Sequence, residues 1–143
     1  MARKLWIRIR VPAHLFMKIK TISYWVTTVL FAGMMAMSGG MYLTHSPEVA
    51  KGFAHLGYPA YFANLLGVAK LLGACALLAP RLAILKEWAY SGFTITLISA
   101  VVSHLASGDG GKEAAGPLIG LVILAASYLL RPAGRRVSFA NSI

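Results

Sequence analysis

Four long runs of mostly apolar residues dominate the sequence, at residues 24–43, 61–79, 88–105 and 114–130. Each run approaches the length of about 20 residues that an α-helix needs to cross the roughly 30 Å hydrocarbon core of a bilayer. None shows the alternation of polar and apolar residues that is typical of a membrane barrel strand. Because short loops join the runs, we expect an all-α membrane protein whose four transmembrane helices form an antiparallel bundle.

The composition agrees with a membrane protein and excludes an ordinary soluble domain. Hydrophobic residues make up 58% of the chain and charged residues 13%, with a mean hydropathy of +0.69, whereas soluble domains are about 45–50% apolar and about 25% charged. The chain has one cysteine, Cys75. An internal disulfide framework and a CxxC dithiol are therefore both excluded.

The loop between the first two runs carries signals for a short helix. Ser46 is suited to an N-cap, Pro47 to the first turn, and Glu48 to the positive end of the helix dipole. Gly57 provides a left-handed stop. Apolar residues recur between these signals at helical spacing, namely Val49, Phe53 and Leu56. We expect a short amphipathic helix on the membrane surface, in the first external loop.

The charges predict the orientation of the bundle. With both termini in the cytoplasm, that side holds 11 positive residues and a single acid, Glu87. The other side holds two positive residues and three acids, so the positive-inside rule favours this orientation in a bacterial inner membrane. The charge asymmetry also accounts for the net charge of +10 without a nucleic-acid partner. The 11 positive residues are Arg3, Lys4, Arg8, Arg10, Lys18, Lys20, Arg81, Lys86, Arg131, Arg135 and Arg136; the opposite side holds Lys51, Lys112, Glu48, Asp109 and Glu113.

Three parts follow along the chain: a basic N-terminal segment (1–20), the four-helix transmembrane domain (21–131) and a basic cytoplasmic tail (132–143). The N-terminal segment is too charged for a signal peptide. Interleaved apolar residues favour its lying along anionic lipid headgroups. One alternative is a disordered tail. Another is a true start at Met17, which would serve equally well before the first run and would leave residues 1–16 outside the native protein.

Lys70 is the one positive charge that topology does not explain. It lies about ten residues into the second run, where a charge costs roughly 2.5–3.5 kcal/mol. Glu87 stands just across the turn at Pro80, and the vertical reach of the two side chains allows them to meet. We predict a Lys70–Glu87 ion pair that holds the second and third helices in register, with a role in ligand binding or proton handling as the alternative.

Small residues at helical spacing predict close packing between helices. The third run carries Gly92, Thr96, Ser99 and Ser103 on one face, and this pattern favours packing over a ligand path. Gly39-Gly40 in the first run indicates close packing or a kink. Two further motifs support the same interpretation, Ala69-x-x-x-Gly73 and Gly116-x-x-x-Gly120.

The expected outer face collects several polar side chains, among them His55, Ser103, His104 and Asp109. With His45 there are three imidazoles on or near this face, and together with a carboxylate they could bind zinc or form a proton port. No histidine pair has the i, i+4 spacing of a helical metal site, so we predict no metal. A hydrogen bond between His104 and Asp109 that holds the loop is the favoured interpretation.

Several sequence pieces resemble the DoxX-like family. They are GFAHLGYP (52–59), LLGVAKLLGACALLAPR (65–81), KEWAYSGF (86–93) and SHLASGD (103–109). The resemblance covers about residues 18–131 and implies a small bacterial inner-membrane protein with four helices. It also implies candidate sites at Lys70, Glu87, His104 and Asp109, which lie within these pieces. The family name derives from a subunit associated with thiosulfate and quinone chemistry.

Two functions compete at this point. The first is an accessory or scaffold subunit that supports a membrane complex, with a redox complex, another membrane protein or a second copy of the chain as its partner. The second is the binding of a quinone-like or other amphipathic small molecule by Lys70 and Glu87. We expect no self-sufficient catalysis and no cofactor beyond such a quinone, because the sequence shows neither a matched haem-ligand pair nor a flavin motif. A proton-coupled transporter ranks last.

Overall fold

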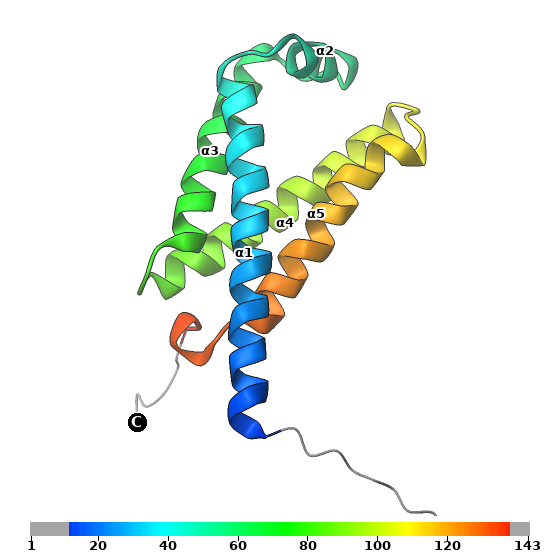
Figure 1. Cartoon of the computed structure of the whole chain (residues 1–143). Coiled ribbons are helices and arrows are strands. Elements are labelled where there is room, and N and C mark those ends of the chain that lie inside the picture. Colours follow the sequence, from blue (N-terminus) through cyan, green and yellow to red (C-terminus); the bar gives the residue numbers. More distant parts are fainter. Residues whose placement is uncertain (1–11, 138–143) are drawn as a thin grey trace, which may run out of the picture.

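The computed structural model describes residues 12–137, which fold into five α-helices and one short 3₁₀ helix (Figure 1). Four of these helices are long and apolar enough to cross a membrane, and the described residues contain no strand. This confirms the predicted helical membrane bundle. The helices are α1 (Ala13–Leu43), α2 (Pro47–His55), α3 (Ala60–Leu78), α4 (Ala83–Ala106), α5 (Gly111–Leu130) and η1 (Ala133–Arg135).

Helix α1 begins earlier than predicted, at Ala13 rather than at Tyr24. Its 31 residues extend about 46 Å at 1.5 Å per residue, well beyond a hydrocarbon core of about 30 Å. The apolar pattern stops at Lys18 and Lys20, but lysine is a good helix former and the backbone continues through it. Part of the predicted N-terminal segment 1–20 is therefore helical, while the rest of its basic residues lie outside the described residues.

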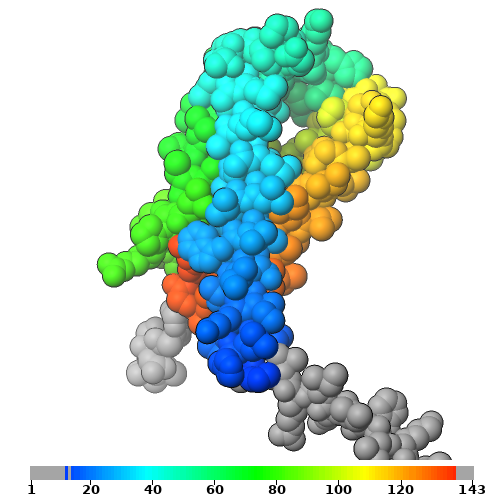
Figure 2. All heavy atoms as spheres, viewed as in Figure 1, coloured from blue at the N-terminus to red at the C-terminus, as the bar shows by residue number. Residues whose placement is uncertain are grey.

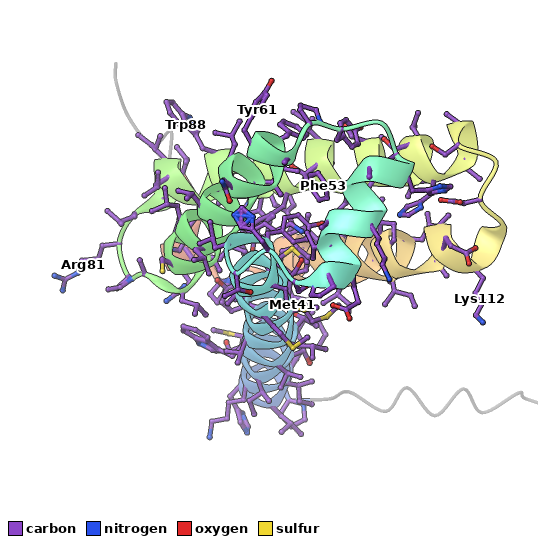
Figure 3. The ribbon with its side chains drawn as sticks, turned by 90° about the horizontal axis from the view of Figure 1, so that it is seen from above. Met41, Phe53, Tyr61, Arg81, Trp88 and Lys112 are labelled. Carbon is purple, nitrogen blue, oxygen red and sulfur yellow. The ribbon has the colours of Figure 1, made fainter. Side chains whose placement is uncertain are left out.

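Helix α2 forms where its capping signals predict it. The Ser46 side chain accepts a hydrogen bond from the Val49 backbone N–H at 3.4 Å, and Gly57 has a φ of +75° two residues after the helix ends. Phe53 is the buried residue of α2. Figure 3 shows its side chain on the side of α2 that faces the other helices, whereas Tyr61 and Trp88 point outward.

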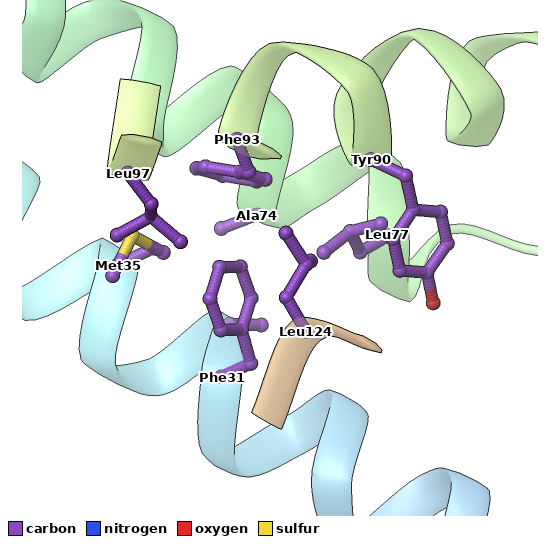
Figure 4. Packing of buried hydrophobic residues seen from close by; sticks show 9 residues of the cluster. Phe31, Met35, Ala74, Leu77, Tyr90, Phe93, Leu97 and Leu124 are labelled. Atoms are coloured by element: carbon purple, nitrogen blue, oxygen red, sulfur yellow. The ribbon is translucent and has the colours of Figure 1, made fainter. Parts of the chain in front are cut away.

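The bundle consists of two helix pairs that meet in one apolar core. Helix α1 packs against α3 and α5, and α4 packs against α5 and α3. The rings of Phe31 and Phe93 meet edge to face at 5.1 Å between centroids. Away from this core the α4–α5 pair diverges from α1 and α3 toward the end covered by α2 (Figure 1). Figure 4 shows the core, which consists of Phe31, Ala32, Met35, Ala74, Leu77, Tyr90, Phe93, Leu97 and Leu124.

Helices α1 and α3 approach each other closely at two glycines. A Cβ atom on Gly39 would lie 3.0 Å from the Gly67 carbonyl oxygen, and one on Gly67 would lie 3.1 Å from the Gly39 carbonyl oxygen. Gly40 faces open space. The predicted close packing is confirmed for Gly39, and the contact seats the backbone of α3 directly against α1, three residues before Lys70.

Candidate functional site

A cavity of about 320 Å³ lies under α2, where the two helix pairs diverge. Figure 2 shows the hollow below α2, between α1 and the outer half of α5. Its floor and walls come from α1, α3 and α4, and its roof from α2 and the residues that follow it. The lining includes Met35, Tyr42, Phe53, Leu56, Tyr58, Phe62, Leu66, Lys70, Phe93, Thr96, Ser99, Ser103 and His104.

Lys70 is the cation of this cavity. Its Nζ donates a hydrogen bond to Ser38 Oγ at 2.8 Å and lies 3.7 Å from the centroid of the Tyr42 ring. The residue is 9% exposed. The hydroxyl acceptor and the aromatic face both attract the ammonium, and so offset part of the cost of placing it inside the membrane.

The predicted Lys70–Glu87 ion pair is wrong. Glu87 Oε1 accepts a hydrogen bond from Arg131 Nη1 at 2.7 Å, while Lys70 contacts α1. The prediction considered the height of each residue along its helix and not its rotation about the helix axis. Lys70 faces α1 and Glu87 faces the end of α5, so the two candidate residues belong to different clusters.

Aromatic rings cover Lys70 on the side of α2. Tyr42 meets Phe53 edge to face at 5.1 Å between centroids, and Phe53 lies 5.9 Å from Tyr58. Tyr58 in turn lies 5.2 Å from Phe62. These four side chains, here called the aromatic roof, come from α1, α2, the α2–α3 turn and α3. Sequence reasoning missed the roof. Its one signal in the sequence is Phe53, which lies at an apolar position of the short amphipathic helix.

The predicted polar stripe of α4 lines the cavity and does not serve close helix packing. Thr96, Ser99 and Ser103 all contribute to the cavity wall, and a Cβ atom on Gly92 would meet nothing within 4 Å. Ser103 Oγ lies 2.6 Å from the Tyr58 hydroxyl, a hydrogen bond that joins α4 to the aromatic roof. The packing prediction for this face is corrected, because the divergence of α4 from α1 leaves its small side chains without a partner helix.

Three of the predicted polar residues meet above the cavity. Asp109 Oδ2 lies 2.7 Å from His104 Nδ1, and Asp109 Oδ1 lies 2.6 Å from His55 Nε2. Hydrogen bonds from His104 and then from His55 hold the pKa of Asp109 below its ordinary value. This confirms the predicted His104–Asp109 contact and adds a link from the loop to the end of α2.

These three side chains form a latch. Each imidazole uses a different oxygen of the carboxylate. No group of three or more His, Cys, Asp or Glu residues within 12–137 is arranged to hold a metal ion. What the latch does is fasten α2, the roof of the cavity, to the turn between α4 and α5.

Lys86, one residue before Glu87, is a structural residue that sequence reasoning missed. Its side chain is 1% exposed, and its Nζ donates to the carbonyl oxygens of Ala76 and Ala79 at the end of α3. A cation is favourable at a helix C-terminus because it meets unpaired carbonyls and the negative end of the dipole. The position of a lysine six residues after the Pro80 stop, at the start of the next helix, was the signal for this role.

The same end of the bundle, here called the arginine-rich end, is joined by further polar contacts. The guanidinium of Arg131 lies 3.9 Å from the Tyr128 ring centroid while it pairs with Glu87. The Tyr90 hydroxyl lies 2.7 Å from Ser127 Oγ, which lies 2.6 Å from Thr28 Oγ1. These bonds connect α4, α5 and α1, and each buried hydroxyl is thereby satisfied.

Comparison with known proteins identifies the family. No curated protein and no solved structure matches the chain. The model of the DoxX-like family matches residues 26–127. The match covers well over half of the chain, including all the cavity-lining residues named above. It contains helices α3 and α4 in full and the greater part of α1 and α5. The chain belongs to the DoxX-like family.

Proposed function

We propose that this membrane protein binds an amphipathic small molecule with a quinone-like headgroup in the cavity under α2, with Lys70 as the polar anchor. The observation that carries the proposal is a nearly buried ammonium at the wall of an aromatic-lined cavity of about 320 Å³. Ligand pockets begin at about 300 Å³ and combine apolar walls with a few polar groups that fix orientation.

The chemistry of the wall suits a planar ring with a hydrogen-bond acceptor. An ammonium carries three N–H donors, and Ser38 takes one of them. A second can donate to a carbonyl oxygen of a ligand, in a charge-assisted hydrogen bond. The aromatic roof offers faces and edges against which a quinone-like ring can pack. The same acceptor would offset more of the cost of the buried charge.

A second space at Lys70 provides room for an apolar tail. A crevice of about 230 Å³ between α3 and α4 is also lined by Lys70, and it includes Gly73, Trp88 and Gly92. The absence of a side chain at Gly92 keeps part of this crevice open toward the membrane. A headgroup in the cavity and a tail in the crevice would meet at Lys70, which lines both.

The scaffold function that the sequence ranks first stays a prediction, as does a membrane-protein partner or a homo-oligomer. A charge sealed by leucine and alanine would favour that function. Lys70 instead lines an aromatic cavity, which supports the binding function. A role as accessory subunit to a redox partner is compatible with both the scaffold function and the binding function.

For the cellular setting we propose a bacterial inner membrane with both chain termini in the cytoplasm. Positive residues gather at the arginine-rich end, whereas the end covered by α2 carries three acids and two lysines among the described residues. The positive-inside rule places the arginine-rich end in the cytoplasm. The cavity under α2 then opens within the outer leaflet.

The test compares ligand binding by the wild-type protein with that of Lys70→Met. Purified protein in mild detergent is titrated with a short-chain ubiquinone analogue, and quinone that co-purifies from the membrane is measured by mass spectrometry. Loss of a charge-assisted hydrogen bond, about 1.5–3 kcal/mol, predicts at least about tenfold weaker binding.

Lys51→Met is the matched control, since Lys51 is exposed on α2 and lies outside the cavity lining. It should bind as the wild type does. Equal affinity of the wild type and Lys70→Met, with both proteins folded by circular dichroism, would overturn the proposal.

A further inference from the structure

A second candidate surface lies at the arginine-rich end, on the opposite side of the core from the cavity under α2. Two hollows adjoin there between α4 and α5. One, of about 520 Å³, is a polar mouth that includes Arg131 and Arg136, and the other, of about 500 Å³, is an apolar groove. Glu87, Tyr128 and Leu129 line both hollows, so mouth and groove form one continuous surface.

The mouth carries an excess of positive charge. It contains two guanidinium groups and one carboxylate, and Glu87 neutralises Arg131. Arg136 is held in place by bonds from Nε to the Arg131 carbonyl at 3.0 Å and from Nη2 to the Leu129 carbonyl at 3.3 Å. The described residues thus use two of its five N–H donors. A fixed guanidinium with further donors suits a phosphate oxygen.

The groove below the mouth is mostly apolar. Ile95, Leu121, Leu124 and Ala125 form its walls. Along α4 from Glu87 to Ile95 the helix rises about 12 Å, most of the roughly 15 Å thickness of one hydrocarbon leaflet. A soluble phosphate compound would leave these walls empty, whereas an acyl chain would fill them.

We propose that mouth and groove together bind one anionic phospholipid. Its phosphate would meet Arg136 and Arg131, and one acyl chain would lie between α4 and α5. The single excess positive charge of the mouth complements a headgroup with one net negative charge, such as phosphatidylglycerol, better than a zwitterionic one. Tyr128 lies where mouth and groove join, at the level of the membrane interface where tyrosine is enriched.

The test measures the lipids that the full chain retains. Purified protein is exchanged into mixed micelles with equal amounts of phosphatidylglycerol and phosphatidylethanolamine, and bound lipid is quantified by mass spectrometry. We expect the wild type to retain phosphatidylglycerol preferentially. In Arg136→Gln the ratio of bound phosphatidylglycerol to bound phosphatidylethanolamine should fall about fivefold, which is the effect of one basic residue near an anionic lipid.

Two further variants make the test specific. Arg81→Gln removes an exposed arginine at the same end but outside the groove, and should retain lipid as the wild type does. Ala125→Trp fills the groove without changing any charge, and should reduce retention. Equal losses in Arg136→Gln and Arg81→Gln would overturn the proposal, since they indicate diffuse attraction. A loss in Arg136→Gln without one in Ala125→Trp would also overturn it, since a phosphate group alone would then suffice.

Discussion

The contact between α1 and α3 can be tested with two neighbouring glycines that differ in their surroundings. A Cβ atom on Gly39 would lie 3.0 Å from the carbonyl oxygen of Gly67 and 3.2 Å from the Lys70 Cβ. The backbone oxygen cannot rotate away, so α1 and α3 must part by a few tenths of an ångström. A Cβ atom on Gly40 would meet nothing within 4 Å. Alanine at either position brings the same gain in helix propensity, up to about 1 kcal/mol.

The difference between the variants therefore isolates the steric cost of moving the helices apart. Overpacking of this kind costs about 1–3 kcal/mol, and the parted surfaces also lose dispersion contacts. We expect Gly39→Ala to unfold with a free energy about 1–3 kcal/mol lower than that of Gly40→Ala. The assay is reversible unfolding in mixed micelles with increasing SDS, followed by circular dichroism. Equal stabilities within about 0.5 kcal/mol would refute the close helix contact.

Two further predictions concern the polar clusters at the two ends. Arg131→Met should lower the free energy of unfolding by about 1–3 kcal/mol, because Glu87 loses its partner but remains partly in contact with solvent. The same micelle assay measures this free energy, and an unchanged value would contradict the Arg131–Glu87 ion pair. Since hydrogen bonds from His104 and His55 lower the pKa of Asp109, the latch should be complete above the ordinary carboxyl pKa and open as the pH falls through the lowered value. Faster hydrogen exchange in the α4–α5 turn at acid pH should reveal the opening, and Asp109→Asn should remove this pH dependence.

Hydrophobic run length and capping residues were sufficient to predict most of the architecture. The four apolar runs became four helices because a bilayer leaves few other ways to satisfy the backbone. Ser46 and Gly57 bounded α2 because capping and positive φ are local requirements. The start of α1 was missed, since charge ends a hydrophobic run without ending a helix.

The side-chain partners depended on helix rotation, which run length does not encode. Lys70 and Glu87 were within vertical reach, yet they face α1 and α5 respectively. The pair Glu87–Arg131 was accessible to sequence reasoning, because the start of α4 and the end of its antiparallel neighbour α5 must lie at one level. Asp109 and His104, five residues apart on one turn, could be paired correctly because the contact is local.

The aromatic roof and the cavity beneath it required the tertiary structure. Their residues come from α1, α2, α3 and α4, and the cavity exists because α4 diverges from α1. No single stretch of sequence encodes that divergence. The polar stripe of α4 was recognised, but its surroundings decide whether small side chains pack against a helix or line a cavity.

Whether the cavity at Lys70 holds a quinone-like headgroup can be measured by photo-crosslinking. A short-chain azidoquinone is bound to the purified wild-type protein, activated by light and located by peptide mass spectrometry. We expect labels on the aromatic roof, at Tyr42, Phe53, Tyr58 or Phe62. Excess unlabelled quinone should prevent this labelling, and Lys70→Met should abolish it. Labels confined to lipid-facing positions such as Ile119 and Val122, unchanged by Lys70→Met, would contradict it.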